Sequence, residues 1–304
     1  YMHARYYDPE AGRFIMKDQT EGLLPNYIDG KKTPESEVIE TAINQALWEI
    51  ACDTDYFVSG NMITQLGKLI NDMASFTNQK RPGGGNTFDA WARMTGRQGN
   101  YISDFFYHAT RGAAIGELSQ HTDHSEFDER YIDTYIEIYN KFNGRNKDDS
   151  GIPVQDLRGK VDDKTFNQYN TEIGFWVSFY DRKCGLNMGF TGDDNHLGLV
   201  DVANLMKALI KQVSSFGMLD NGKPKNHNPG WGLTAVTTDC SPALREFTGL
   251  TFEKVGIMQD SWQNIGAGMG HLMGKMKKLD SYPDSFGVNH SIDQWYQAIR
   301  NYNG

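Results

Sequence analysis

The sequence predicts a helix-rich α+β fold, with a helical front half and a mixed C-terminal part. Apolar residues recur at helical spacing within the first 150 positions, which indicates helices that each bury one face. By contrast, residues 171–179 have the composition of a β-strand. A polar stretch over residues 143–151 is expected to link the two parts, so we divide the chain into a helical region at 25–150 and a mixed α+β region at 151–304.

The first predicted helix begins after Thr33. Thr33 can cap this helix, Pro34 suits its first turn, and Glu35 meets the positive end of the helix dipole. A second helix is predicted over 60–76, where apolar residues again fall on one face. The run KRPGGGN at 80–86 is expected to break the chain after it.

The later elements follow from the same patterns. Helices are predicted over 101–119 and 126–142, and again over 197–216. The segment 219–231 is expected to be a loop because it is rich in glycine, proline and asparagine. The sequence contains no internal repeat.

Composition and charge disfavour several classes of function. The 304 residues carry a net charge of −9, and an acidic surface repels nucleic-acid phosphates. No run of about 18 apolar residues is present, so no membrane span is expected. The three cysteines, Cys52, Cys184 and Cys240, are too few and too widely spaced for a disulfide framework or a zinc site. We therefore predict no bound metal and no cofactor, and we do not favour nucleic acid as a partner.

The chain opens with a predicted β-hairpin. Residues 1–22 read YMHARYYDPEAGRFIMKDQTEG, in which Asp8 and Pro9 open a turn and Gly12 supplies a flexible position. The letters RYYDP, GRF and the later aspartate resemble the core-associated motif that closes the repeats of Rhs, or YD-repeat, proteins. We therefore assign residues 1–24 to the end of an Rhs core.

This resemblance implies a function for the rest of the chain. In Rhs proteins the repeats build a β-cocoon that encloses a variable C-terminal effector. By resemblance, the chain would be a toxin that a bacterial secretion system delivers into a target cell. Its expected partners are the Rhs cocoon shell and a cognate immunity protein that protects the producing cell.

A cysteine near a predicted helix start is the leading candidate for chemistry. The run NPGWGLTAVTTDCSPAL at 228–244 places Cys240 just before an apolar helix, which Asp239 or Ser241 can cap. A thiol at a helix N-terminus is expected to have a lowered pKa and to react as a thiolate. Nucleophilic attack then requires a base, which His271 or His290 can supply.

The order of these residues resembles the NlpC/P60 peptidases, papain-like enzymes that cut peptidoglycan stem peptides. Trp231 with its glycine, and Asp239 with the following Cys-Ser pair, fall on the nucleophile segment of that family. By resemblance, Cys240 would be the nucleophile, His271 the base and His290 the orienting group. Trp231 and Asp239 would contact the substrate, and the C-terminal part would be papain-like.

Other interpretations remain open for these and further residues. Cys240 can instead be a buried residue at a helix start, because cysteine is often buried. Gly192–His196 and His121–Glu126 contain metal-ligand types but also suit polar loops that cap helices. His108–Arg111 resembles the opening strand of ADP-ribosyltransferases, yet its apolar neighbours follow a helical spacing. Gly266–Gly274 can contact a membrane surface or form a core helix.

Two classes of function follow. The first is an enzymatic toxin, with a cysteine hydrolase acting on peptidoglycan or protein amide bonds as the favoured chemistry. An ADP-ribosyltransferase or a nuclease is the alternative within this class. The second class is a non-enzymatic effector that acts on a membrane or occupies a target protein.

Overall fold

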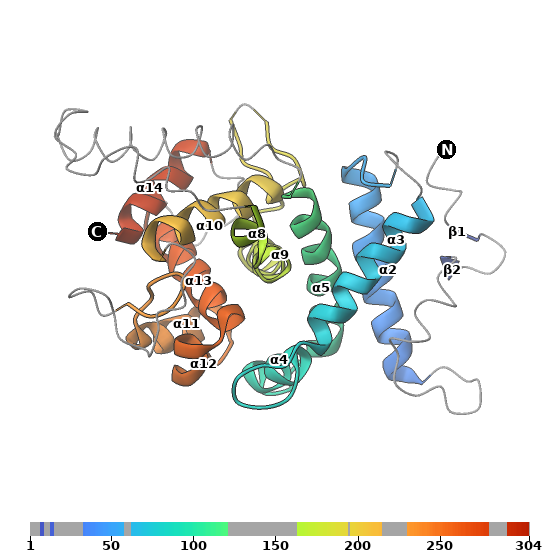
Figure 1. Ribbon diagram of the computed structural model, residues 1–304, viewed down its shortest axis with the longest axis horizontal. Coiled ribbons are helices and arrows are strands. Elements are labelled where there is room, and N and C mark those ends of the chain that lie inside the picture. The colour runs from blue at the N-terminus through green and yellow to red at the C-terminus, as the bar shows by residue number, and fades with distance from the viewer. Residues whose placement is uncertain are drawn as a thin grey trace.

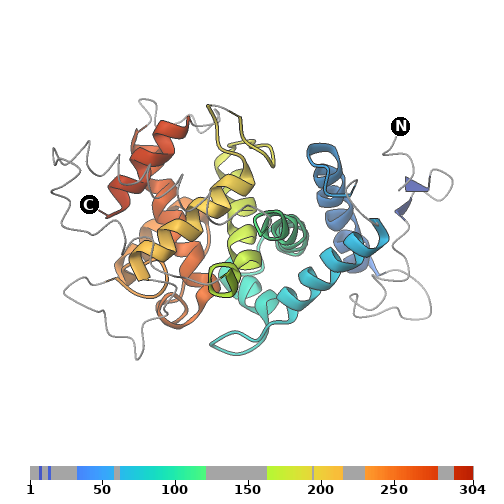
Figure 2. The ribbon, with the colours of Figure 1, turned by 45° about the horizontal axis from the view of Figure 1, so that its top comes forward.

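The computed structural model describes residues 7–8, 13–14, 33–57, 62–120, 163–193, 195–214, 230–279 and 291–303. These residues form α2 (Pro34–Asp53), α3 (Met62–Asn78), α4 (Thr87–Thr95), α5 (Tyr101–Leu118), α8 (Asp163–Asn167), α9 (Asn170–Cys184), α10 (Leu199–Ser214), α11 (Ser241–Thr248), α12 (Lys254–Gln259), α13 (Ser261–Leu279) and α14 (Ile292–Asn303), with a 3₁₀ turn, η3, at Thr238–Cys240. α2 and α3 lie at one end and α10 to α14 at the other, with α5 and α9 between them (Figures 1 and 2). The predicted helix-rich fold is therefore confirmed.

The predicted N-terminal hairpin is present as a short antiparallel pair. β1 (Tyr7–Asp8) pairs with β2 (Arg13–Phe14), so that Tyr7 lies opposite Phe14 and Asp8 opposite Arg13. These four residues belong to the RYYDP and GRF letters of the opening motif.

Four of the predicted helices are confirmed as α2, α3, α5 and α10. The Thr33 hydroxyl caps α2 as expected, because it accepts a hydrogen bond from the backbone N–H of Ser36 at 3.1 Å. The helix predicted at 126–142 and the linker at 143–151 lie outside the described residues. No helix among the described residues has the length and apolar character needed to cross a lipid bilayer.

The strand predicted at 171–179 is wrong, because this segment belongs to the helix α9. Residues 172–181 are all buried, so the aromatic and β-branched composition reflects burial on every side of a helix. α9 packs against α5, α10, α13 and α3, which cover it. No β-strand occurs among the described residues of 151–304, which contain only isolated β-bridges.

Glycines allow α5 and α9 to cross with their backbones in contact. A Cβ atom on Gly112 of α5 would collide with the backbone of Phe175. A Cβ atom on Gly174 of α9 would collide with the carbonyl of Gly112. Gly116, one turn further along α5, meets the backbone of Asn170 in the same way. The closest helix pair in the core therefore depends on residues without side chains.

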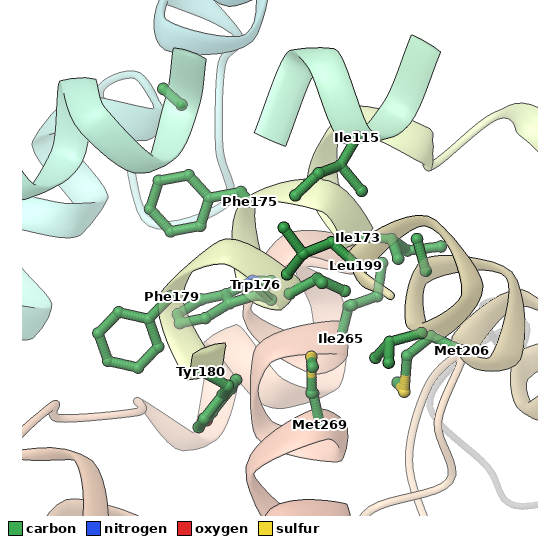
Figure 3. Packing of buried hydrophobic residues seen from close by; sticks show 14 of the residues in the cluster. Ile115, Ile173, Phe175, Trp176, Phe179, Tyr180, Leu199, Met206, Ile265 and Met269 are labelled. Atoms are coloured by element: carbon green, nitrogen blue, oxygen red, sulfur yellow. The ribbon is translucent and has the colours of Figure 1, made fainter. Parts of the chain in front are cut away.

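Aromatic side chains of α9 pack against α13, and Figure 3 shows Trp176 and Tyr180 beside Ile265 and Met269. The ring of Trp176 stacks on Trp262 with centroids 5.1 Å apart, and its indole N–H donates to the Trp262 carbonyl at 2.6 Å. The Tyr180 hydroxyl donates to the carbonyl of Gly266 at 2.8 Å. Side chains at Gly266 and Gly270 would collide with Trp176 and Tyr180, respectively. The segment Gly266–Gly274 is therefore part of a core helix.

Candidate active site

A tight turn precedes the predicted nucleophile. The backbone N–H of Trp231 donates to the carbonyl of Val236 at 2.7 Å, and Gly232 adopts a φ of +66° that favours glycine. Asn264 of α13 holds this turn: its Nδ2 donates to the Trp231 carbonyl at 2.8 Å, and its Oδ1 accepts from the Thr234 N–H at 2.9 Å. Asn264 is fully buried. Trp231 thus contributes its backbone to a turn that a core asparagine fixes.

Cys240 is partly buried, and its environment opposes ionisation. Its thiol donates to the carbonyl of Thr237 at 2.8 Å. Burial raises the pKa of the Cys240 thiol to about 11, the negative charge of Asp239 adds to this, and a backbone hydrogen bond only partly offsets it. The predicted lowering of this pKa is therefore wrong. Because η3 runs directly into α11, Cys240 already has helical backbone angles and does not lie at a free helix N-terminus.

Tyr302 of α14 contacts His271 and lies within electrostatic range of Cys240. Its ring contacts the His271 imidazole edge to face, with centroids 5.1 Å apart. Burial raises the pKa of Tyr302, and a negative charge on Cys240 is close enough to raise it further. The Tyr302 hydroxyl donates to the carbonyl of Thr234 at 2.5 Å. Residues far apart in the sequence therefore meet around this tyrosine.

The packing of α11 on α13 is consistent with this convergence. A Cβ atom on Gly270 would collide with Leu244 of α11 and with the Tyr180 hydroxyl, and His271 is the next residue. Burial raises the pKa of Tyr180 well above its ordinary value, and charges on Cys184 and Cys240 add to the effect. α11 therefore contacts α13 beside His271. The third predicted catalytic residue, His290, lies outside the described residues.

A pocket of about 580 Å³ lies beside the start of α11, and its lining includes Ser241, the residue after Cys240. It is lined by Ser241, Pro242, Arg245, Glu246, Thr251 and Phe252. Phe252 is buried, and the Ser241 hydroxyl oxygen is buried without a hydrogen-bond partner among the described residues. Asp239, which was predicted to contact substrate, is exposed next to Cys240.

A scan against models of protein families found no match, and searches of curated proteins and of solved structures found none either. Within the described residues, no group of three or more histidine, cysteine, aspartate or glutamate side chains is placed to hold a metal ion.

The aspartate-histidine loop before α10 acts locally. The Asp193 carboxylate accepts from the backbone N–H groups of Asn195 at 2.7 Å and His196 at 2.8 Å, and lies 3.0 Å from the His196 ring nitrogen. The bond from Asn195 and the contact with His196 lower the pKa of Asp193. This geometry agrees with the polar-loop interpretation. The other cluster with metal-ligand types, His121–Glu126, lies outside the described residues.

His108 lies in α5 and not in a strand, as its helical spacing predicts. It is buried, and its Nδ1 lies 2.9 Å from the Ser178 hydroxyl. Burial lowers the pKa of His108, and the charges of Arg182 and Arg111 lower it further. The strand that the ADP-ribosyltransferase resemblance requires is absent at this position.

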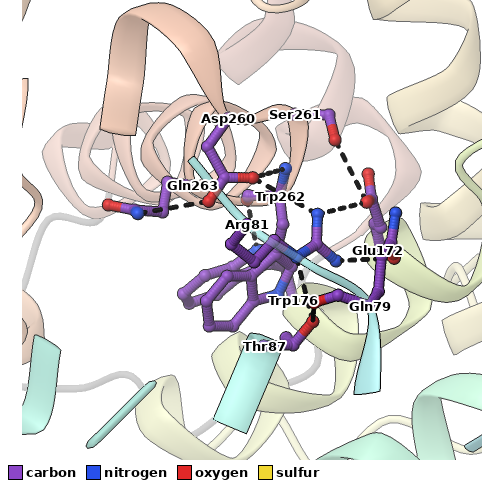
Figure 4. A network of polar contacts seen from close by, with 9 residues as sticks. All are labelled: Gln79, Arg81, Thr87, Glu172, Trp176, Asp260, Ser261, Trp262 and Gln263. Atoms are coloured by element: carbon purple, nitrogen blue, oxygen red, sulfur yellow. Dashed lines mark hydrogen bonds and ion pairs between the residues drawn. The ribbon is translucent and has the colours of Figure 1, made fainter. Parts of the chain in front are cut away.

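A buried ionic network, not predicted from the sequence, joins three distant segments (Figure 4). Nη1 of Arg81 donates to Glu172 at 2.6 Å and to Asp260 at 3.2 Å. Its Nε donates to the Thr87 hydroxyl at 2.9 Å, and Ser261 donates to Glu172 at 3.0 Å. Burial raises the pKa of both Glu172 and Asp260, while Arg81 opposes the rise. The network ties the loop before α4 to α9 and to the start of α13.

Proposed function

We propose that this chain is the C-terminal effector end of an Rhs-family toxin. The observation that carries the proposal is the opening motif, in which RYYDP and GRF lie close together in the sequence. The pairing of Tyr7 with Phe14 and of Asp8 with Arg13 supports it, because a hairpin is the form expected for a closing repeat. Delivery into a target cell, an Rhs cocoon shell and a cognate immunity protein are parts of the same proposal.

We further propose cysteine-dependent hydrolysis of an amide bond, in peptidoglycan or protein, as the chemistry of this effector. The supporting observation is that the Tyr302 ring contacts the His271 imidazole and that a charge on Cys240 acts on the same tyrosine. Cys240 would attack the carbonyl carbon and His271 would take its proton. The pocket after Cys240 offers space for a substrate side chain. A papain-like C-terminal arrangement, with His290 as the orienting group and Trp231 and Asp239 near the substrate, completes the proposal.

The raised pKa of Cys240 restricts how this chemistry can proceed. With a pKa of about 11, the thiol at pH 7 is ionised in roughly one molecule in ten thousand. A preformed thiolate therefore contributes little. His271 must instead remove the proton as the carbon–sulfur bond forms, which is general-base catalysis.

Expression of the chain in bacteria tests the proposal in two steps. The wild-type chain should arrest growth in the cytoplasm or in the periplasm, and the protein encoded by the adjacent gene should restore growth. An innocuous chain in both compartments would contradict the toxin proposal.

The C240A variant separates the chemistry from the toxin assignment. We expect C240A and H271A to abolish growth arrest, because each removes a catalytic group, whereas C52A, which changes an exposed cysteine, should remain toxic. Equal toxicity of C240A and wild type would reject thiol chemistry and leave the effector proposal standing. A membrane-active or target-binding effector predicts that outcome.

A further inference from the structure

Lys207 of α10 is a fully buried lysine whose hydrogen-bond partners among the described residues are neutral. Its Nζ donates to the hydroxyl of Ser119 at 2.9 Å and to the carbonyl of Ser119 at 3.2 Å. The third donor bond goes to Oδ1 of Asn167 at 3.1 Å, and the Phe166 ring lies 5.3 Å away. The end of α5 and the end of α8 thus meet at one amine.

Two other buried cations among the described residues, Arg81 and Arg111, have carboxylate partners. Arg81 contacts Glu172 and Asp260, and Arg111 contacts Asp181 at 2.7 Å as well as a second carboxylate. In the part of the chain that the structure describes, no carboxylate lies within ion-pair distance of Lys207. Burial without a counter-ion lowers the pKa of Lys207 to about 7.

The nearest described carboxylate along α5 does not stabilise the protonated form of the Lys207 amine. Glu117 is the nearest described carboxylate along α5, two residues before Ser119, and it forms an ion pair with Lys68 of α3. A large fraction of Lys207 is therefore a neutral amine near pH 7, which is the form that a general base needs.

We propose that Ser119 and Lys207 form a serine–lysine catalytic dyad that cleaves an acyl donor, an ester or an amide. Ser119 would be the nucleophile, Lys207 the general base, and Asn167 the residue that positions the amine. This site is independent of Cys240 and is assigned by the 2.9 Å distance between Oγ and Nζ. The Ser119 hydroxyl donates to the carbonyl of Gly116 at 2.9 Å, and rotation of its hydrogen alone redirects it to a neutral amine.

The chemical steps balance with water as the second reactant. Ser119 Oγ bonds to the acyl carbon while its proton passes to Nζ of Lys207, and collapse of the tetrahedral intermediate breaks the bond to the leaving group, which takes that proton. Water then attacks the acyl-serine and gives its proton to Lys207. Release of the carboxylic acid returns that proton to Ser119 Oγ, which restores the dyad.

A purely structural role for Lys207 makes different predictions. Its bond to the Ser119 carbonyl caps the C-terminal end of α5, as basic side chains often do. Capping requires only a hydrogen-bond donor, whereas the dyad requires an amine that can lose its proton. Ser119 and Lys207 are both buried, so the dyad also requires the end of α5 to open to a reagent.

Labelling of the whole chain with an alkyl fluorophosphonate, followed by peptide mass spectrometry, tests the dyad. We expect phosphonylation of Ser119, with a rate that rises about tenfold between pH 6 and pH 8 as an amine of pKa about 7 loses its proton. S119A should abolish the adduct, and K207M should lower its rate at least about 100-fold.

Two further variants separate catalysis from folding. K207R keeps a cation that can cap α5 but cannot act as a base, so it should label as slowly as K207M. Its permanent charge is buried, so it should melt below the wild type, and labelling is compared at a temperature where circular dichroism shows both chains folded. K211M, which changes a lysine one turn further along α10, should label at the wild-type rate. Failure of the folded wild-type chain to label at Ser119 at any pH would overturn the dyad, as would labelling of K207R at the wild-type rate.

Discussion

Arg81 and Lys207 are both buried cations, but the groups that surround them differ in charge. Two carboxylates, on Glu172 and Asp260, compensate Arg81. Within the part of the chain that the structure describes, the amine of Lys207 contacts hydroxyl, carbonyl and amide oxygens and no carboxylate. A buried charge with counter-ions stays charged and ties elements together, whereas one without counter-ions shifts towards its neutral form. Arg81 therefore has a structural role, whereas the role that we propose for Lys207 is chemical.

The largest expected effect is the loss of the compensated cation. R81M leaves Glu172 and Asp260 buried without a cation, so we expect it to lower the free energy of unfolding by roughly 3–5 kcal/mol. Urea unfolding at pH 7 measures this change. R93M is the matched control, because Arg93 is exposed on α4 and its loss should change stability by less than about 0.5 kcal/mol. Equal stability of the two variants would contradict the structural role of Arg81.

A pH-dependent effect is expected at the uncompensated lysine. The pKa of Lys207 is about 7 in the folded chain, against about 10.4 for lysine in an unfolded chain. Between these values the unfolded state binds more protons, so the wild-type chain gains stability as the pH rises and loses it as the pH falls towards 7. We expect the wild-type chain to gain about 2 kcal/mol relative to K207M between pH 7 and pH 9. If the difference in free energy of unfolding between the wild-type chain and K207M stays constant with pH, the pKa of Lys207 is not lowered.

The smallest expected effect concerns one carboxylate of the Arg81 network. Burial raises the pKa of Glu172, and its Oε2 has no hydrogen-bond partner among the described residues. Between the ordinary and the raised pKa the folded state binds more protons, so wild-type stability falls as the pH rises through that window. E172Q removes this dependence and should change stability at pH 7 by about 1 kcal/mol or less, because Asp260 still pairs with Arg81.

Urea unfolding of E172Q at several pH values from 4.5 upwards checks the sign. The variant should show a shallower fall in stability than the wild type. E246Q, at an exposed position of α11, should follow the wild-type curve. A steeper fall for E172Q would mean that the pKa of Glu172 is lowered by Arg81 and not raised by burial.

Much of the helical structure follows from local patterns in the sequence. Thr33 and the apolar spacing after it predict α2, and the same spacing predicts α3, α5 and α10. The composition of α9 predicts a strand, and this prediction fails. Its aromatic residues are buried on all sides by helices that are distant in the sequence, which a local pattern does not reveal. α4 was not predicted beside the glycine run, although Asn86 and Asp89 form a capping box that signals its start.

The candidate sites depend more strongly on tertiary structure. The order of motifs indicates Cys240 and His271, but the contact of Tyr302 with His271 requires α14 to fold back on α13. Burial also reversed the expected direction of the Cys240 pKa. Nothing in the sequence marks Lys207 as buried, because its burial depends on the packing of α10 against α5 and α9. Spacing along one helix cannot supply that information.

A ¹³C NMR titration of the chain labelled at its lysines tests most directly whether Lys207 is neutral near physiological pH. We predict one lysine side-chain signal that titrates near pH 7 and is missing from K207M. A set of lysine signals that all titrate above about pH 9 in the folded wild-type chain would contradict the assignment of Lys207 as a base.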